Sequence, residues 1–497
     1  MKNTLLFLFF VVTTTFTKNS DAQNFDWAYT TAKPSLTQAI SIRKDQANNF
    51  YLASQRDSSV NHLSSEIEKR DDAQALLWNK VFPGDVIISD LELTSTDHAV
   101  IIGYYMDSLE IDGTTIHSGI FSYSGFICEF DQAGTLLWLN DVNPVQDDFR
   151  PYDLYITQNG NMYITSEMNG AVNDFTSFHQ LDAQGNIIKS EFNNNTEART
   201  NTNIIADDDG NVYLSGTCGN FAVFDSIQAN LNFSYQNFVM KYDSTFKALW
   251  FHSRNYITFD HNNSLQLNGN YVYWAFDDFT DNSDTVKIIK IDLNGNIDRE
   301  IVGPIAQSFF PSIQFNMDPQ GNSVMAFEIY SRLILFRYDP SFNITSQDTI
   351  LTGAASFRNS SDIKCYDSTM YIAGLYYSDT MQIGAFTLIN ANQTANWPTD
   401  MFVCKWSQSA ITSVSDLEKS ESLVTIYPNP ATDKISFNFD LKESEDYTVR
   451  IFDNLGKNLI ETKATSKNLD VSSLSNGLYY IELISGKQMV RNRFIKQ

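Results

Sequence analysis

The sequence predicts an all-β protein, a seven-bladed β-propeller followed by a small Ig-like β-sandwich. Three observations support this prediction: the composition, an internal repeat, and a change of pattern in the last 75 residues. Of the 497 residues, 42% are apolar and 13% are aromatic, and short apolar runs alternate with stretches rich in Gly, Asn, Ser and Thr. Such runs between turn residues are typical of short strands.

The charge of the chain excludes some classes of partner. The formal net charge is −25 and the pI is about 4.5. Nucleic acid is excluded as a partner, because neutralising its phosphates requires clustered Lys and Arg. Adhesion to an anionic membrane by charge alone is equally disfavoured. No apolar run reaches the roughly 20 residues that a spanning helix needs, so we expect no transmembrane segment.

The internal repeat lies in residues 23–406. The first half of the unit is a strand, a tight turn with Asn or Asp plus Gly, and an apolar strand, as in residues 204–216. The second half is an apolar strand, an Asp-led turn and a strand that often contains Trp, as in residues 126–138. The first half recurs at seven places, near Tyr51, Ile101, Tyr163, Tyr213, Tyr273, Val324 and Tyr371. Seven four-stranded units with a mean step of about 53 residues predict a seven-bladed β-propeller.

The last repeat lacks its fourth strand before the repeat region ends at Trp406. A segment that resembles the missing strand, Phe25–Tyr29, stands at the other end of the region. We expect this segment to add to the last blade as its outer strand and close the ring, because closure removes the unpaired edges at the seam.

The two ends of the chain differ from the repeat region. Residues 1–22 resemble a signal peptide, with Lys2, an apolar run over residues 5–12, and a cleavage site between Ala22 and Gln23. Residues 407–422 are polar and are expected to form a linker. In residues 423–497, seven short alternating strands are separated by turn residues, which predicts a small β-sandwich.

Several motifs in residues 423–497 follow one another in a set order. They are Tyr427-Pro428-Asn429-Pro430, Ile451 to Lys457 with Gly456, Gly477-Leu478-Tyr479-Tyr480, and Arg493 to Lys496. This order resembles the type A C-terminal sorting domain of the type IX secretion system of the Bacteroidetes. The resemblance implies that residues 423–497 engage the secretion translocon and direct the chain through the periplasm to the outer-membrane surface or the medium. An ordinary β-sandwich module is the alternative.

The Asp-led turns resemble those of secreted bacterial β-propeller repeats. They are also similar to pyrroloquinoline-quinone-type repeats, which place Gly and Trp one position later. Sialidase Asp-boxes need Ser or Thr two residues before the Asp, where Glu129 and Lys241 stand. Neither enzyme family is therefore inferred.

The sequence contains no motif for catalysis, a metal site or a cofactor. The six histidines have no metal-ligand spacing, and no G-x-S-x-G motif is present. The segments Asp207 to Asn211 and Asp292 to Asp298 could suit calcium, but no distant bidentate carboxylate follows and the repeat needs a hairpin turn at both places. We therefore expect no catalytic residue, no metal and no cofactor. The four cysteines are expected to be free, because they fall in different blades or on non-adjacent strands.

Five Asp-Ser/Thr-apolar triplets begin at Asp107, Asp225, Asp284, Asp348 and Asp379. They resemble the O-glycosylation sequon of Bacteroidetes periplasmic proteins. Each is equally explained by a turn residue that precedes a strand, and both interpretations stay open.

Ligand binding is expected on the face where the second and third strands of the blades connect. These connections are long and unequal, at residues 55–75, 104–125, 217–236 and 375–400, as is typical of loops fitted to a partner. Flat rings beside amide and hydroxyl groups suit glycan or peptide contact. The candidate aromatic residues in these connections are Tyr104, Tyr105, Phe233, Tyr235, Tyr376, Tyr377 and Trp397. The alternative is that they pack their own loops onto the blades.

The predicted function is a secreted or cell-surface β-propeller binding protein with a glycan or protein ligand. The alternative is an exported hydrolase or lyase acting on polysaccharide or peptide, with its site in the central funnel. Converging carboxylates or a His–metal cluster in the funnel would favour the enzyme, and aromatic and amide side chains would favour binding.

Overall fold

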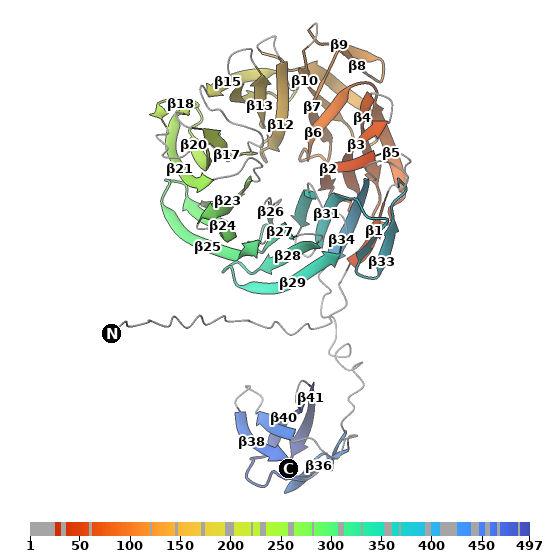
Figure 1. Ribbon diagram of the computed structural model, residues 1–497, viewed down its shortest axis with the longest axis vertical. Coiled ribbons are helices and arrows are strands. Elements are labelled where there is room, and N and C mark those ends of the chain that lie inside the picture. The colour runs from red at the N-terminus through yellow and green to blue at the C-terminus, as the bar shows by residue number, and fades with distance from the viewer. Residues whose placement is uncertain are drawn as a thin grey trace, which may run out of the picture. The chain divides into compact units, whose positions relative to one another are not determined.

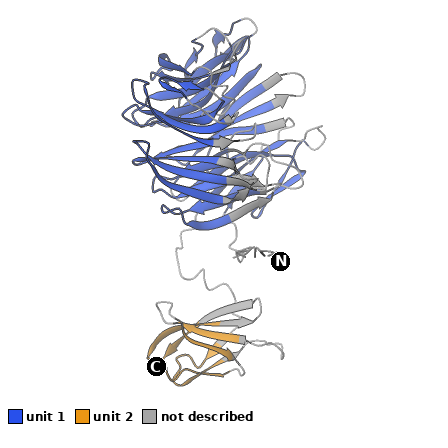
Figure 2. Ribbon diagram, turned by 60° about the vertical axis from the view of Figure 1, so that its left-hand side comes forward, with its two compact units in different colours: residues 1–408 blue, residues 409–497 orange. Residues whose placement is uncertain are grey.

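The structure is a computed structural model of the whole chain (Figure 1). It describes residues 25–30, 36–58, 62–119, 122–144, 148–169, 174–193, 203–219, 222–228, 235–256, 263–280, 283–306, 313–329, 332–351, 360–366, 369–392, 399–407, 425–438, 447–452, 458–464, 468–485 and 488–497. The chain divides into two compact units, residues 1–408 and residues 409–497 (Figure 2).

Unit 1, residues 1–408, consists mainly of four-stranded antiparallel sheets, which Figure 1 shows arranged around a common centre. Sheet 1 contains β2 (Leu36–Lys44), β3 (Phe50–Ser58), β4 (His62–Arg70) and β5 (Leu76–Phe82). Sheet 2 contains β6 (Val86–Leu93), β7 (Ala99–Tyr105), β10 (Ser124–Phe130) and β11 (Leu136–Asp141). Sheet 3 contains β12 (Asp148–Ile156), β13 (Met162–Asn169), β14 (Asp174–Leu181) and β15 (Ile187–Asn193).

The remaining sheets repeat this order. Sheet 4 contains β16 (Asn203–Ala206), β17 (Val212–Gly219), β20 (Tyr235–Tyr242) and β21 (Ala248–Tyr256). Sheet 5 contains β22 (Asn263–Asn268), β23 (Tyr271–Thr280), β24 (Ser283–Asp292) and β25 (Ile297–Ala306). Sheet 6 contains β26 (Ile313–Met317), β27 (Ser323–Ile329), β28 (Arg332–Tyr338) and β29 (Ile344–Leu351), and it is extended beyond β29 by β32 (Thr380–Ile383) and β33 (Phe386–Ile389). Sheet 7 contains β30 (Ser360–Tyr366), β31 (Thr369–Tyr376), β34 (Asp400–Ser407) and β1 (Phe25–Tyr29).

The all-β prediction is confirmed, and the arrangement of the sheets is propeller-like. In the described residues every regular element is a strand, and no helix is long and apolar enough to cross a membrane. The expected position of the N-terminal strand is also confirmed, because β1 pairs antiparallel with β34 at the outer edge of sheet 7. Trp27 on β1 is only 8% exposed and lies 5.2 Å from the ring of Phe50 in sheet 1. This strand therefore links the two ends of unit 1.

The Asp-led turns join neighbouring sheets. In the turn that begins at Asp131, the carboxylate accepts hydrogen bonds from the N–H groups of Ala133 at 2.9 Å and Thr135 at 2.8 Å. Gly134 has φ +82°, and a Cβ atom there would lie 2.7 Å from the Trp78 ring of the preceding sheet. Gly adopts this positive φ without strain, and it is needed for the close approach of the ring.

The same contact recurs around unit 1. A Cβ atom at Gly185 would lie 2.5 Å from Trp138, and one at Gly295 would lie 2.7 Å from Trp250. These contacts explain why the turns combine Asp, Gly and Trp: Trp of one sheet packs on Gly of the next.

The two candidate calcium segments are hairpin turns in the structure. The carboxylate of Asp207 accepts hydrogen bonds from the backbone N and the Nδ2 of Asn211, both at 2.8 Å. Asp292 is bonded in the same way to Asn296, and these hydrogen bonds lower the pKa of Asp292. The oxygens that calcium would need therefore stabilise the turns.

One predicted connection is wrong and three contain unpredicted hairpins. Residues 55–75 are not a long loop, because β3 pairs with β4 as far as Ser58 and His62. The other three connections contain the hairpins β8 (Ser108–Ile111) with β9 (Thr114–His117), β18 (Val223–Phe224) with β19 (Ile227–Gln228), and β32 (Thr380–Ile383) with β33 (Phe386–Ile389). Asp107 and Asp225 have positive φ beside these strands, which agrees with the turn interpretation of their triplets. Glycosylation of the triplets stays a prediction.

The four cysteines are free, as expected. Cys128, Cys218 and Cys404 are buried, and Cys365 is half-buried. Burial raises the pKa of each of these thiols.

Unit 2, residues 409–497, contains two sheets that share one hydrophobic core. One sheet is formed by β35 (Thr425–Tyr427), β36 (Lys434–Asn438) and β39 (Asn468–Asp470), and the other by β38 (Asn458–Ala464), β37 (Tyr447–Phe452), β40 (Gly477–Ser485) and β41 (Gln488–Lys496). Ile435 of the first sheet and Val449, Ile481 and Phe494 of the second lie in this core. The described residues of this unit form seven strands, β35 to β41, which is the predicted number.

The motif residues of unit 2 hold its two ends together. The Oδ1 atom of Asn429 accepts a hydrogen bond from the N–H of Ile495 at 2.9 Å. Tyr479 stacks on Phe494 with 5.7 Å between ring centroids and donates a hydrogen bond to the carbonyl of Ser475. Lys496 is buried at the end of β41. Gly456 and the predicted cleavage site at Ala22 and Gln23 lie outside the described residues.

Candidate functional site

The predicted aromatic residues do not form one surface. Tyr105 and Tyr376 are 0% and 1% exposed, so their expected exposure is wrong. Tyr105 lies in the core with Leu109 of β8, and Tyr376 lies in the core with Met381 of β32. Their rings fix the two hairpins to the sheets, which is the packing alternative.

The other candidates have different positions. Tyr104 and Tyr377 are half-buried. The side chain of Tyr235, and the whole of Phe233 and Trp397, lie outside the described residues. Ligand contact by Tyr104, Tyr235, Tyr377 and Trp397 stays a prediction.

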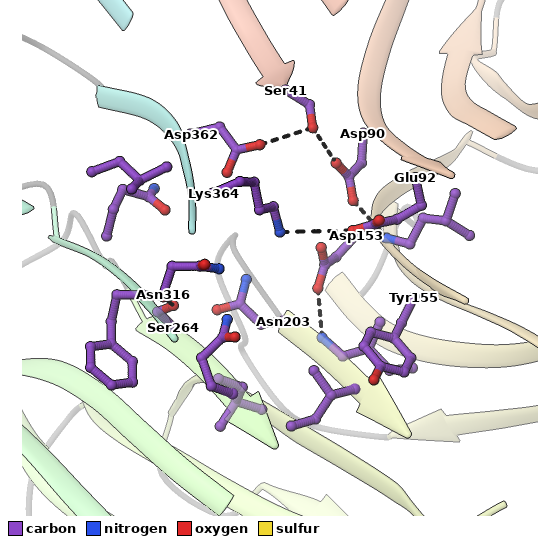
Figure 3. Close-up of a pocket in the computed structure, with 18 of the residues that line it drawn as sticks. Ser41, Asp90, Glu92, Asp153, Tyr155, Asn203, Ser264, Asn316, Asp362 and Lys364 are labelled. Carbon is purple, nitrogen blue, oxygen red and sulfur yellow. Dashed lines mark hydrogen bonds and ion pairs between the residues drawn. The ribbon is translucent and has the colours of Figure 1, made fainter. Parts of the chain in front are cut away.

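A cavity of about 280 Å³ lies among the innermost strands of unit 1. Its lining comes from β2, β6, β12, β16, β22, β26 and β30, which are the innermost strands of sheets 1 to 7 (Figure 3). The cavity is therefore assembled from segments spread over more than 300 residues of the chain.

Each innermost strand contributes one polar side chain at an equivalent position, and we call this set the inner ring. It consists of Ser41, Asp90, Asp153, Asn203, Ser264, Gln314 and Asp362. Several members bond to the backbone of the next innermost strand: Asp362 accepts from the N–H of Ile42 at 3.0 Å, Asp90 from that of Leu154 at 3.1 Å, and Asp153 from that of Ile204 at 2.6 Å. These hydrogen bonds join neighbouring sheets at the centre of unit 1.

A β-bulge in the innermost strand comes directly before four members of the inner ring. The register of the innermost strand shifts just before Ser41, Asp90, Asp153 and Asp362. An extra residue in a strand bends it and redirects the side chains that follow. The bulges therefore turn these polar groups towards the centre and the adjacent sheet.

One side of the cavity is charged. The Arg43 guanidinium, in a residue only 6% exposed, forms ion pairs with Asp362, with Glu92 at 2.7 Å and with Asp90 at 3.4 Å. Its Nη1 also donates to Ser41 Oγ at 2.7 Å. A buried guanidinium is tolerated because carboxylates surround it.

The carboxyl groups of this side have different pKa values. Burial and then the neighbouring Asp90 raise the pKa of Asp153 well above its ordinary value. Burial also raises the pKa of Asp90, against the effect of Arg43. For Asp362 burial acts in the same direction, but Arg43 and Lys364 outweigh it and lower the pKa. Asp153 therefore keeps its proton at a pH where an ordinary carboxyl has lost it.

The opposite side of the cavity is uncharged. Figure 3 shows Asn203, Ser264 and Asn316 across from Ser41, Asp90 and Asp362. Gln266 and Gln314 also line this side. The Oδ1 atom of Asn203 and the Oγ atom of Ser89 are buried and have no hydrogen-bond partner among the described residues.

Lys364 lies between the two sides. Its ammonium is 3.8 Å from a carboxylate oxygen of Glu92, which is longer than a hydrogen bond. An ammonium, carboxylate oxygens and amide groups therefore line the same small cavity.

Within the described residues, no group of three or more His, Cys, Asp or Glu side chains is placed to hold a metal ion. His179 is buried among Ser177 and Ser190, and burial lowers its pKa to about 3. This histidine is a neutral core residue.

None of the cavity residues belongs to a candidate site predicted from the sequence. The signal that could have found them is a polar residue in the first strand of each repeat, at Ser41, Asp90, Asp153, Asn203, Ser264, Gln314 and Asp362. Because the steps between these positions vary, the pattern is hard to see before the strands are aligned.

Residues 425–497 match a family described as the secretion system C-terminal sorting domain. This match supports the predicted type IX sorting domain, and it indicates export out of the cell, to the surface or the medium. No curated protein matches the chain in sequence.

Several solved structures are similar to this chain. The polysaccharide lyase Uly1 is 10% identical with a TM-score of 0.47, over 77% of this chain and 99% of that one. A protein of unknown function from Bacteroides caccae is 10% identical with a TM-score of 0.35, over 63% and 94%. Prolyl oligopeptidase B from Galerina marginata is 11% identical with a TM-score of 0.40, over 90% and 56%. At these sequence identities and TM-scores, the similar structures give no information about the activity of this chain.

Proposed function

We propose that the protein is an exported propeller-like binding protein whose central cavity holds a neutral sugar unit of a glycan. The sorting-domain match supports export. The observation that supports sugar binding is the mixed lining of the cavity, where Lys364, Glu92 and several amides face the same space.

A sugar hydroxyl matches this lining chemically. A hydroxyl donates one hydrogen bond and accepts others, whereas an ammonium only donates and a carboxylate only accepts. Neighbouring hydroxyls can therefore accept from Lys364 and donate to Glu92 or to the unpartnered Oδ1 of Asn203. The volume of about 280 Å³ lies near the lower end for small-molecule sites, roughly 300 Å³ and above. The enclosed part of the ligand is accordingly small.

The second candidate is an exported hydrolase or lyase acting on polysaccharide or peptide. Converging carboxylates and the raised pKa of Asp153 favour it, because a general acid must keep its proton near the working pH. However, both oxygens of Asp90 accept hydrogen bonds from protein groups, and Asp153 is bonded to the next strand. These carboxyl groups already hold neighbouring sheets together and are not free to act on a substrate. Binding is therefore the better supported function.

We further propose that sheets 1 to 7 are the blades of a closed seven-bladed propeller over residues 23–406. The strand order of the sheets and the β1–β34 pairing support this count. Residues 1–22 would be a signal peptide cleaved before Gln23, residues 407–422 a linker, and residues 423–497 an Ig-like sorting domain of type A from the Bacteroidetes.

The export proposal is tested by deleting residues 423–497 in a strain with an intact secretion system. The truncated protein should remain in the periplasm, and fractionation with antibodies measures its location. Arrival of the truncated protein in the medium in normal amounts would contradict the assignment.

The binding proposal is tested by calorimetric titration of the full chain with neutral monosaccharides. Gln266→Ala removes a cavity amide and should weaken the binding of a hit by about tenfold, from the loss of one hydrogen bond or more. Gln228→Ala removes an exposed amide outside the cavity and is the matched control. Folded protein that binds no neutral sugar would overturn the proposal, and release of cleaved products from glycans or peptides would favour the enzyme.

A further inference from the structure

A cluster of aromatic and charged side chains lies where sheets 2 and 3 meet. It consists of Tyr104 on β7, Tyr123 just before β10, and Arg150 and Tyr152 on β12, and we call it the tyrosine–arginine cluster. Tyr104 is also one of the aromatic residues that the sequence predicts to contact a ligand.

Arg150 organises the cluster. Its guanidinium lies 4.6 Å from the ring centroid of Tyr123 and 5.6 Å from that of Tyr104. The two rings are 5.2 Å apart and nearly perpendicular, at 85°. Asp148 fixes the guanidinium through two hydrogen bonds of 2.9 and 2.7 Å, from Nε and one terminal nitrogen. Such a planar fork keeps a defined orientation.

The cluster is continuous with the central cavity. Tyr152 lines the cavity, and its hydroxyl donates a 2.5 Å hydrogen bond to Glu167. Sheets 2 and 3 are in close contact here, because a Cβ atom at Gly125, paired with Tyr104, would lie 2.8 Å from Phe149 and Pro151. The N–H of Phe149 also donates to the carbonyl of Tyr123 at 3.0 Å.

We propose that the tyrosine–arginine cluster is a second sugar subsite, so that the ligand is an oligosaccharide with one unit in the cavity and the next on the cluster. This inference rests on the proposed function. An aromatic ring offers an apolar face to the C–H side of a sugar, and its hydroxyl remains a polar group at the edge. The terminal nitrogen of Arg150 that does not bond Asp148 adds donors for sugar hydroxyls. Tyr152 is the wall shared by the two subsites.

The test compares ligand length in full-length protein. Calorimetry measures binding of gluco-, manno- and galacto-oligosaccharides of one to four units. In the natural protein, affinity should rise from one unit to two or three and then level off. Tyr104→Ala should remove most of this rise, about tenfold, and leave the affinity for the single sugar unchanged. Tyr104→Phe keeps the ring and should retain most of the rise.

A second variant covers the possibility that Tyr104→Ala disturbs the packing of sheets 2 and 3. Arg150→Lys keeps the charge but loses the planar fork, and it should also reduce the gain from the second unit. A rise with length that persists in folded Arg150→Lys or Tyr104→Ala protein would overturn the subsite and leave the cavity proposal standing. Failure of every sugar to bind the natural protein would overturn both.

Discussion

The Asp-led turns and the inner ring both recur from sheet to sheet, but only the turns could be predicted from the sequence. A turn places Asp131, Gly134 and Trp138 within eight residues, so its chemistry is visible as a local motif. A contact of the inner ring joins Asp90 to Leu154, or Asp362 to Ile42, which are 64 and 320 residues apart. The difference indicates that the scaffold is encoded locally, whereas the cavity is encoded by positions that meet only after folding.

The turns also vary in a correlated way between neighbouring sheets. Where one sheet presents Trp78, Trp138 or Trp250, the next turn has Gly. Where sheet 3 presents Lys189, the next turn has Phe246, with φ +66° and its ring 4.0 Å from the ammonium. In these three pairs a large ring on one side is matched by the smallest residue on the other.

The largest expected effect is at the closure of the ring. Trp27→Ala should destabilise unit 1 by about 3–5 kcal/mol, the usual cost of removing a buried aromatic side chain. Trp27 contacts Phe50 of sheet 1 and Tyr371 of sheet 7, so both ends of the ring lose packing. Denaturant unfolding measures the change, with Leu137→Ala as control, because Leu137 lies on the outer strand β11 of sheet 2 and is 47% exposed. Equal stability of the two variants would mean that β1 does not hold the ring closed.

A smaller effect is expected where Gly meets Trp. Gly134→Ala should destabilise the protein by about 2–3 kcal/mol, from the positive φ and from the contact with Trp78. Gly113→Ala is the matched control, because Gly113 has φ +84° but nothing within 4 Å of a Cβ atom. That variant should cost only about 1 kcal/mol. Equal losses would show that the Trp contact is unimportant.

The matching of residue size can be tested by exchanging one pair. Lys189→Trp alone should be unfavourable because Phe246 occupies the space, and Phe246→Gly added to it should recover stability. We expect a coupling free energy of about 1 kcal/mol between the two changes, measured by a double-mutant cycle. Additive effects would contradict size matching between sheets.

The fold was predictable because its determinants are local. The strands of unit 2 and the β1–β34 closure followed from short alternating runs and a missing strand. The cavity was not predictable, because Asp90 or Asn203 has no local pattern that distinguishes it from a surface residue. Tyr105 and Tyr376 were misjudged for the same reason: the hairpins β8–β9 and β32–β33 that cover them were too short to predict, and in sequence a covered ring looks like an exposed one.

The central claim is that the carboxyls of the inner ring hold sheets together, so that the cavity binds rather than catalyses. Below the ordinary pKa of a carboxyl, Asp153 is protonated in both the folded and the unfolded protein. As pH rises, the unfolded state ionises first, so the raised pKa of Asp153 makes the folded state progressively less stable until that pKa is passed. Asn at this position can accept the hydrogen bond from the N–H of Ile204 without ionising.

Thermal unfolding of the natural protein and of Asp153→Asn between pH 4 and pH 8 tests this claim most directly. We expect the variant to gain stability relative to the natural protein as pH rises, by about 1.4 kcal/mol for each pH unit between the ordinary and the raised pKa. Stability profiles that run parallel over this pH range would contradict the account of the inner ring.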